Sequence, residues 1–115
     1  MRRLLFLAGL MLMAQSLLLA QSPKQATLTN DGVIMINKDA LSPVYTIDIS
    51  QIAFKDKAHA ERYLQPFNDE SMTARLNMEN RTVTLTLNVD DKPDWTLQMW
   101  QSLLKRKARP VSSVN

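Results

Sequence analysis

The residues of this chain that could hold a metal ion are one histidine and several methionines, because the sequence contains no cysteine. Thioether sulfur is a soft ligand that selects Cu(I), and imidazole also suits copper. His59, Met72 and Met78 are the candidates for such a thiol-free site. The two methionines lie at the ends of one expected strand, and the rise of a β-strand separates them by about 20 Å. We therefore expect methionine to fill gaps in the core. No metal site and no cofactor are expected, and a copper site built from methionine and His59 is the alternative.

Catalysis would require partners for His59, the only histidine in the sequence. Asp56 lies one helical turn before it and could orient the imidazole. General acid–base and nucleophilic catalysis both need further groups at bonding distance. The sequence has no serine, histidine and aspartate at a triad spacing, and Gly9 and Gly32 are too far apart for a phosphate-binding loop. We therefore expect no catalytic residues and interpret His59 as a partly exposed helix residue near a cap.

Trp95 and Met99 are the residues that best fit a surface for a partner protein. They are four residues apart, so on a helix they share one face. If Leu97, Trp100 and Leu104 face the sheet, Trp95 and Met99 face outward, and aromatic side chains are common anchors at interfaces. The alternative is that Trp95 folds back over the end of the preceding strand near Val89.

Periodic patterns predict the elements that position these side chains. Alternation of apolar and polar residues predicts strands, and a helix needs apolar residues three and four apart. Asp31-Gly32 predicts the tight turn of a hairpin. Expected elements are a hairpin at residues 26–37, strands at 45–49, 72–78 and 83–89, a helix from Asp56 to Pro66, and a last helix that opens in DDKPDW and ends near residue 108.

The order of elements from residue 45 is strand, helix, strand, strand, helix, which is the ferredoxin-like βαββαβ pattern without its last strand. Too little chain follows Pro110 to supply that strand. We expect the second strand of the hairpin, residues 33–37, to take its place and to run antiparallel to residues 45–49. The predicted fold is therefore an α+β, ferredoxin-like β-α-β-β-α core with an antiparallel sheet and an N-terminal hairpin as its edge.

Over residues 44–106, this order of elements and their lengths resemble exported heavy-metal-associated domains. The metal-binding loop of that family, Met-x-Cys-x-x-Cys, lies between the first strand and the first helix. The corresponding stretch here is SQIAFKDKAH, residues 50–59, which contains no cysteine. The resemblance therefore implies the fold of the family, and the missing motif implies that its metal binding is absent.

The first twenty residues have the composition of a secretory signal. Arg2 and Arg3 precede an apolar run that ends at Ala20, and the chain then becomes polar. We expect cleavage between Ala20 and Gln21, and Ala14-Gln15-Ser16 offers a second, earlier cleavage point. An uncleaved helix that anchors the protein in a membrane is the alternative. The expected organisation is a signal peptide at residues 1–20, a polar leader at 21–25, one α+β domain at 26–108 and a C-terminal tail at 109–115.

The charge of the chain and its lack of cysteine indicate which partners and which cellular location to expect. Residues 21–104 contain eight basic and eleven acidic side chains, so the body lacks the basic face that nucleic-acid binding requires. Small secreted eukaryotic domains usually carry disulfides, so an exported chain without cysteine favours the bacterial envelope. We expect a periplasmic or secreted, non-catalytic module that binds a protein partner. Contact with a membrane is expected only through an uncleaved N-terminal segment.

Overall fold

The computed structural model describes residues 23–36 and 40–114. The expected signal peptide, the cleavage point between Ala20 and Gln21, and the start of the polar leader lie outside these ranges. Within the two ranges, no helix has the length and apolar character needed to cross a membrane.

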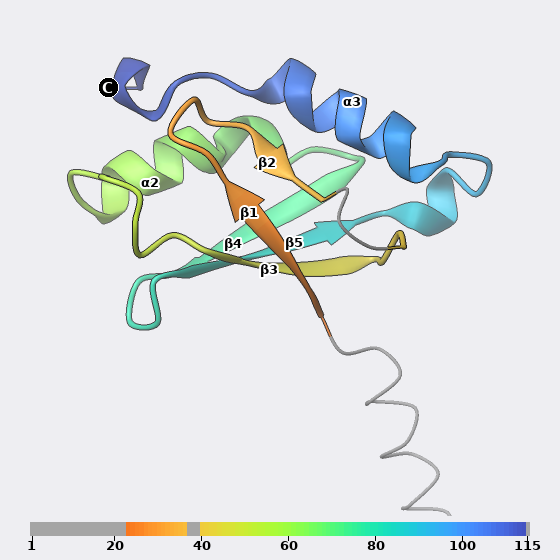
Figure 1. Cartoon of the computed structure of the whole chain (residues 1–115), viewed down its shortest axis with the longest axis horizontal. Helices are drawn as coiled ribbons and strands as arrows, with labels where there is room; N and C mark the ends of the chain where they lie inside the picture. Colours follow the sequence, from red (N-terminus) through yellow and green to blue (C-terminus); the bar gives the residue numbers. More distant parts are fainter. Residues whose placement is uncertain (1–22, 37–39, 115) are drawn as a thin grey trace, which may run out of the picture.

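Five strands form one sheet in the order β2-β1-β3-β5-β4 (Figure 1). The pairs β1–β2, β3–β5 and β4–β5 are antiparallel, whereas β1 and β3 are parallel. Side chains alternate between the two faces of each strand, so one face of the sheet is buried. The strands are β1 Lys24–Leu28, β2 Ile34–Met35, β3 Val44–Asp48, β4 Met72–Asn77 and β5 Thr82–Leu87.

Two α-helices cover the sheet, and Figure 1 shows both on the same side of β3, β4 and β5. The carboxylate of Asp56 caps the first of them by accepting the backbone N–H of His59 at 2.8 Å, as the sequence predicts. The helical segments of the described chain are α2 Lys57–Leu64, α3 Leu97–Lys107 and the short 3-10 turns η1 Gln65–Phe67, η2 Val89–Asp91 and η3 Val111–Ser113.

The core lies between the helices and the buried face of the sheet. The amphipathic stripe predicted for α2 and η1 is confirmed, since Ala60, Tyr63, Leu64 and Phe67 are all buried. Trp100 and Leu104 of α3 have no exposed surface. Their sheet-side partners in the same hydrophobic cluster include Tyr45, Ile47, Met72, Val83 and Leu85.

The α+β class expected from the sequence is confirmed, but the expectation of an antiparallel sheet is wrong, because the sheet is mixed. The hairpin forms, and Gly32 in its turn has a φ of +82°, which suits glycine. The hairpin joins the sheet beside β3 through its first strand, β1, and not through its second strand, β2. Lys24 to Ala26 of β1 pair in parallel with Tyr45 to Ile47 of β3.

The second strand of the hairpin, β2, can lie at the outer edge of the sheet because a side chain of α3 forms hydrogen bonds with its outward-facing backbone groups. The backbone N–H of Ile36 donates to Oε1 of Gln101 at 2.7 Å, and Nε2 of Gln101 donates to the carbonyl of Ile34 at 2.8 Å. The buried carboxamide therefore stands where a neighbouring strand would bond. With β2 covered in this way, only β1 is available to pair with β3.

The last helix begins later than the sequence predicts. Residues 89–91 form η2, and α3 starts only after Thr96, whose hydroxyl accepts the backbone N–H of Met99 at 3.3 Å. Asp91 is engaged elsewhere, because its Oδ2 accepts the side-chain N–H of Asn88 at 2.8 Å. Thr96 caps α3 because it directly precedes the helix, whereas the aspartates lie too early in the chain to reach the first N–H groups of the helix. Trp95 is consequently outside the helix.

Residues 109–114, which the sequence analysis separates from the domain as a tail, pack against its body. Val111 and Val114 are buried in the hydrophobic core. The turn of the N-terminal hairpin lies against this segment, where a Cβ at Gly32 would stand 1.7 Å from the carbonyl oxygen of Arg109. Glycine is therefore required at position 32 both for its backbone angle and for space.

Candidate functional site

His59 is buried, with 2% of its surface exposed, and the expectation of a partly exposed side chain is wrong. Nδ1 accepts the backbone N–H of Lys55 at 3.1 Å, and Nε2 lies 2.8 Å from the carbonyl oxygen of Val114. Because Nδ1 accepts a hydrogen bond, Nε2 is the ring nitrogen that donates to the carbonyl of Val114. Phe54 packs edge-on against the imidazole, with 5.6 Å between the ring centroids.

The surroundings of His59 leave no ring nitrogen for chemistry. The carboxylate of Asp56 binds the backbone N–H of His59 and does not orient the imidazole. A metal ligand needs an imidazole lone pair, and a general base needs a free nitrogen. In this structure the Nδ1 lone pair and the Nε2 proton both serve backbone groups, so His59 joins the start of α2 to the C-terminal segment.

Met72 and Met78 lie at different ends of β4. Met72 is 1% exposed and belongs to the core, whereas Met78 lies in the turn that follows the strand. The extended backbone between them keeps the two sulfur atoms apart. Among the described residues, no three or more histidine, cysteine or acidic side chains gather in a way that could hold a metal ion. Met72 therefore acts as a packing residue.

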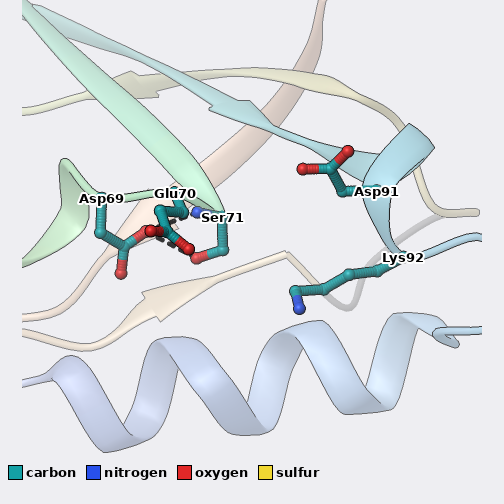
Figure 2. Close-up of a pocket in the computed structure, with 5 residues that line it drawn as sticks. All are labelled: Asp69, Glu70, Ser71, Asp91 and Lys92. Carbon is teal, nitrogen blue, oxygen red and sulfur yellow. Dashed lines mark hydrogen bonds between the residues drawn. The ribbon is translucent and has the colours of Figure 1, made fainter.

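A polar pocket of about 440 Å³ lies between the start of β4 and η2 (Figure 2). Asp69, Glu70 and Ser71 line one side, and Asp91 and Lys92 line the other. The sequence analysis did not identify this pocket, because the whole β4–β5 hairpin separates the two segments along the chain. Only the pairing of β4 with β5 could have indicated that they meet.

Asp69 is the most constrained carboxylate of this pocket. Its Oδ1 accepts the N–H of Ser71 at 2.8 Å and the Ser71 hydroxyl at 2.7 Å. Its Oδ2 binds the ammonium of Lys107, which also donates to the carbonyl of Pro66 at 2.8 Å. Burial raises the pKa of Asp69, but hydrogen bonds from Lys107 and Ser71 outweigh burial and hold that pKa well below its usual range. Asp69 is thus a charged structural group that fastens α3 to the loop before β4.

A shallow groove of about 380 Å³ on α3 contains both residues proposed for partner binding. Met99 is 48% exposed, whereas Trp95 is partly buried. Trp95 packs edge-on against Trp100 at 4.9 Å between ring centroids, and the ammonium of Lys92 lies 4.7 Å from the centre of the Trp95 ring. Both candidates line this groove, but Trp95 lies in the turn before the helix and packs against the core, so of the two only Met99 faces outward as expected. We call this feature the α3 groove; its lining is Trp95, Thr96, Gln98, Met99, Ser102 and Arg106.

The α3 groove combines an apolar floor with positive charge. Trp95 and Met99 supply the apolar surface, and the guanidinium-bearing Arg106 lies further along the same face of the helix. Such a groove can accept an apolar side chain that stands next to a carboxylate, since arginine binds carboxylates through paired hydrogen bonds. Comparison of the chain with protein-family models, with curated proteins and with solved structures finds no match.

Proposed function

We propose that this protein is a small exported domain of the bacterial envelope that binds another protein and catalyses no reaction. The observation that carries the proposal is the α3 groove, where Met99 leaves 48% of its surface in water. Apolar side chains that remain exposed in a groove are typical of partner surfaces, and tryptophan and arginine are enriched among residues that dominate binding. His59, the residue best suited to chemistry, is bonded to backbone at both ring nitrogens.

We further propose that β3, α2, β4, β5 and α3 form a ferredoxin-like core. Its support is that β5 lies between β3 and β4 and is antiparallel to both, with both helices on one face of the sheet. In this view β1 replaces the last edge strand but runs parallel to β3. The resemblance to heavy-metal-associated domains then concerns the frame of the fold, and residues 50–59 keep the strand-to-helix junction without the cysteines.

Export is tested by the mass of the protein that cells accumulate. A periplasmic form beginning at Gln21 is the expected result, because a small residue precedes a polar one at this point. A form that retains residues 1–20 and stays with the membrane fraction would support the anchored alternative. Recovery of the full-length chain from the cytoplasm would contradict export.

Partner binding is tested by affinity capture from envelope extract with the immobilised protein and three variants. Met99→Lys places a charge on the apolar floor, and Arg106→Glu inverts the charge of the α3 groove. Lys105→Glu is the matched control, because it makes the same charge change on α3 outside the groove. A partner of this surface is retained by the wild type and by Lys105→Glu and is depleted by the two groove variants, each by about tenfold. Equal recovery by all four proteins would contradict the proposal.

A further inference from the structure

β4 is an outer strand of the sheet. One hydrogen bond shows which of its backbone groups point toward β5 and which point to the free edge. In an antiparallel pair, residues that bond the neighbour alternate with residues whose N–H and C=O face away from it. The N–H of Asn88 donates to the carbonyl of Ser71 at 2.8 Å, so residues 71, 73 and 75 bond toward β5. Met72, Ala74 and Leu76 therefore present their backbone groups to the free edge.

The first part of this edge is closed by the loop that precedes β4. The N–H of Asp69 donates to the carbonyl of Met72 at 3.0 Å, and the N–H of Met72 donates to Oδ1 of Asp69 at 3.2 Å. The N–H of Ala74 donates to Oδ1 of Asn68 at 2.8 Å. In the part of the chain that the structure describes, no such bond reaches the carbonyl of Ala74 or the N–H and carbonyl of Leu76. Three consecutive groups of the edge, acceptor, donor and acceptor, are open.

The opposite edge of the sheet is treated differently. Gln101 supplies both a donor and an acceptor to β2 and so occupies the place of a further strand. Open strand edges promote pairing with other chains, and proteins usually block them. A sheet that closes one edge with a buried side chain and leaves residues 74–76 open has one edge suited to binding an extended segment.

A groove of about 350 Å³ runs beside the open part of β4 and is shared with α2. Leu64 of α2 and Leu76 of β4 add apolar surface to a groove whose lining is otherwise largely polar, and the small side chain of Ala74 leaves space between them. Lys57 and Glu61 stand along the helix side of this groove and pair with each other at 3.9 Å. A strand added to β4 would direct every second side chain toward this space.

Arg75 also lines this groove, but its place between Ala74 and Leu76 in the strand turns its Cβ to the other face of β4. Arg75 is exposed, and the ion pairs found among the described residues, Lys57–Glu61 and Lys107–Asp69, do not include it. Opposite charges on directly facing strand residues stabilise the pairing of strands. The side chains of an added strand on this face would therefore be acidic where they oppose Arg75.

We propose that residues 74–76 of β4 bind an extended segment of another protein by strand addition, and that this segment alternates apolar and acidic residues. The apolar side chains enter the groove between α2 and β4, and the acidic side chains oppose Arg75. Main-chain bonds supply affinity in this mode of recognition, and the alternate side chains supply specificity. The inference rests on the proposed role in protein binding and adds a second surface, distinct from the α3 groove.

The test uses the protein expressed from the 115-residue sequence and a synthetic heptapeptide with blocked ends in which glutamate and isoleucine alternate. Hydrogen exchange of backbone amides is followed by NMR. The Leu76 N–H is expected to exchange at least about tenfold more slowly at saturating peptide, since a hydrogen-bonded amide exchanges only on opening. A peptide with N-methyl groups on the amides that face β4 is expected to give no protection.

Variants separate this edge from the rest of the surface. Arg75→Glu is expected to raise the Kd of the peptide by about fivefold, the scale of one exposed ion pair. Arg62→Glu makes the same charge change on exposed α2 and is the matched control, with the Kd unchanged. Leu76→Pro deletes the open donor, which edge strands tolerate, and is expected to raise the Kd by about tenfold.

Four results would overturn the inference. One is an unprotected Leu76 amide at millimolar peptide, and the second is equal binding of the N-methylated peptide. The third is a Leu76 amide that is protected without peptide in a protein that sediments as a dimer, because the edge would then be occupied by a second copy. Peptide-induced shifts confined to Met99 and Arg106 would also overturn it, while leaving the α3 groove as a binding surface. Met99→Lys, which leaves the β4 edge intact, is expected to bind the heptapeptide like the wild type.

Discussion

At the scale of single residues, His59 connects the start of α2 to a segment 55 residues later in the chain. Its two ring nitrogens make different bonds, and two substitutions can separate them. Asparagine places an acceptor near Nδ1, and glutamine places a donor near Nε2. His59→Asn should keep the bond from Lys55 and lose the bond to Val114, and His59→Gln should do the reverse.

Each of these two variants is expected to lower the free energy of unfolding by about 1–2 kcal/mol, and His59→Ala by about 3 kcal/mol, because buried partners are left without a bond. Urea denaturation measures the change. Lys57→Gln, at an exposed position of the same helix, is the control and should change stability by less than about 0.5 kcal/mol. A His59→Ala protein as stable as the wild type would contradict the structural role.

Asp69 makes stability depend on pH in a definite direction. Its pKa in the folded protein is held below that of an unfolded aspartate, near 3.9, by Lys107 and Ser71 in spite of burial. The charged form therefore stabilises the fold above about pH 4, and this contribution is lost as the pH falls through the folded-state pKa. Asp69→Asn should cost about 1 kcal/mol at neutral pH, since the pair with Lys107 is partly exposed.

The difference in unfolding free energy between wild type and Asp69→Asn is expected to shrink as the pH falls from about 5 to about 2. Urea denaturation across this range measures it, with Asp94→Asn as an exposed control. A difference that stays constant with pH would show that the charge of Asp69 contributes nothing.

Whether the sequence could predict the role of a carboxylate depended on how far along the chain its partner lies. The Asp56 cap could be predicted because its partner is three residues away, whereas the bond from Lys107 to Asp69 depends on the fold.

At the scale of elements, Gln101 replaces a missing neighbour of β2. Gln101→Ala removes two buried backbone partners, so it should lower the free energy of unfolding by about 2 kcal/mol. The uncovered edge should also promote self-association. Urea denaturation and sedimentation measure the two effects, and Gln98→Ala on the exposed side of α3 is the control. A monomeric Gln101→Ala protein of unchanged stability would show that water replaces the carboxamide without cost.

The strands and helices could largely be predicted because their periodic patterns are local. Alternation predicted β4 and β5 within a residue or two, and the apolar stripe predicted α2. The pairing partner of β3 could not be predicted in the same way, because its alternation is compatible with either strand of the hairpin. The choice depends on Gln101, which lies 65 residues from the backbone N–H that it binds. For the same reason, Trp95 and Met99 were identified as neighbours while the geometry that joins them was not.

At the scale of the whole molecule, the C-terminal segment completes the core. A chain ending at Pro110 loses the burial of Val111 and Val114, each worth about 1.5–3 kcal/mol, and also the acceptor of His59. Since small domains are stable by only about 5–15 kcal/mol, the truncated protein should be marginally folded. Thermal unfolding and amide NMR measure this outcome, and Val111→Ala with Val114→Ala should give a smaller loss. A truncated chain that melts like the wild type would contradict a core that includes this segment.

The two surfaces proposed for binding share no residue, since one lies on α3 and the turn before it and the other on α2 and β4. Occupation of one is therefore compatible with occupation of the other, and a single domain can bridge two partners. Both surfaces depend on α2 and α3 being fixed over the sheet, which the C-terminal segment and the Lys107–Asp69 pair accomplish.

The burial of Val114 beside His59 also sets the order of events when the chain is made. Synthesis proceeds from the N-terminus, so the described strands, α2 and α3 are all made before residues 111–114. Until then the imidazole lacks its acceptor and the core lacks two apolar side chains. The core that the structure describes is thus completed only after residues 111–114 have been made.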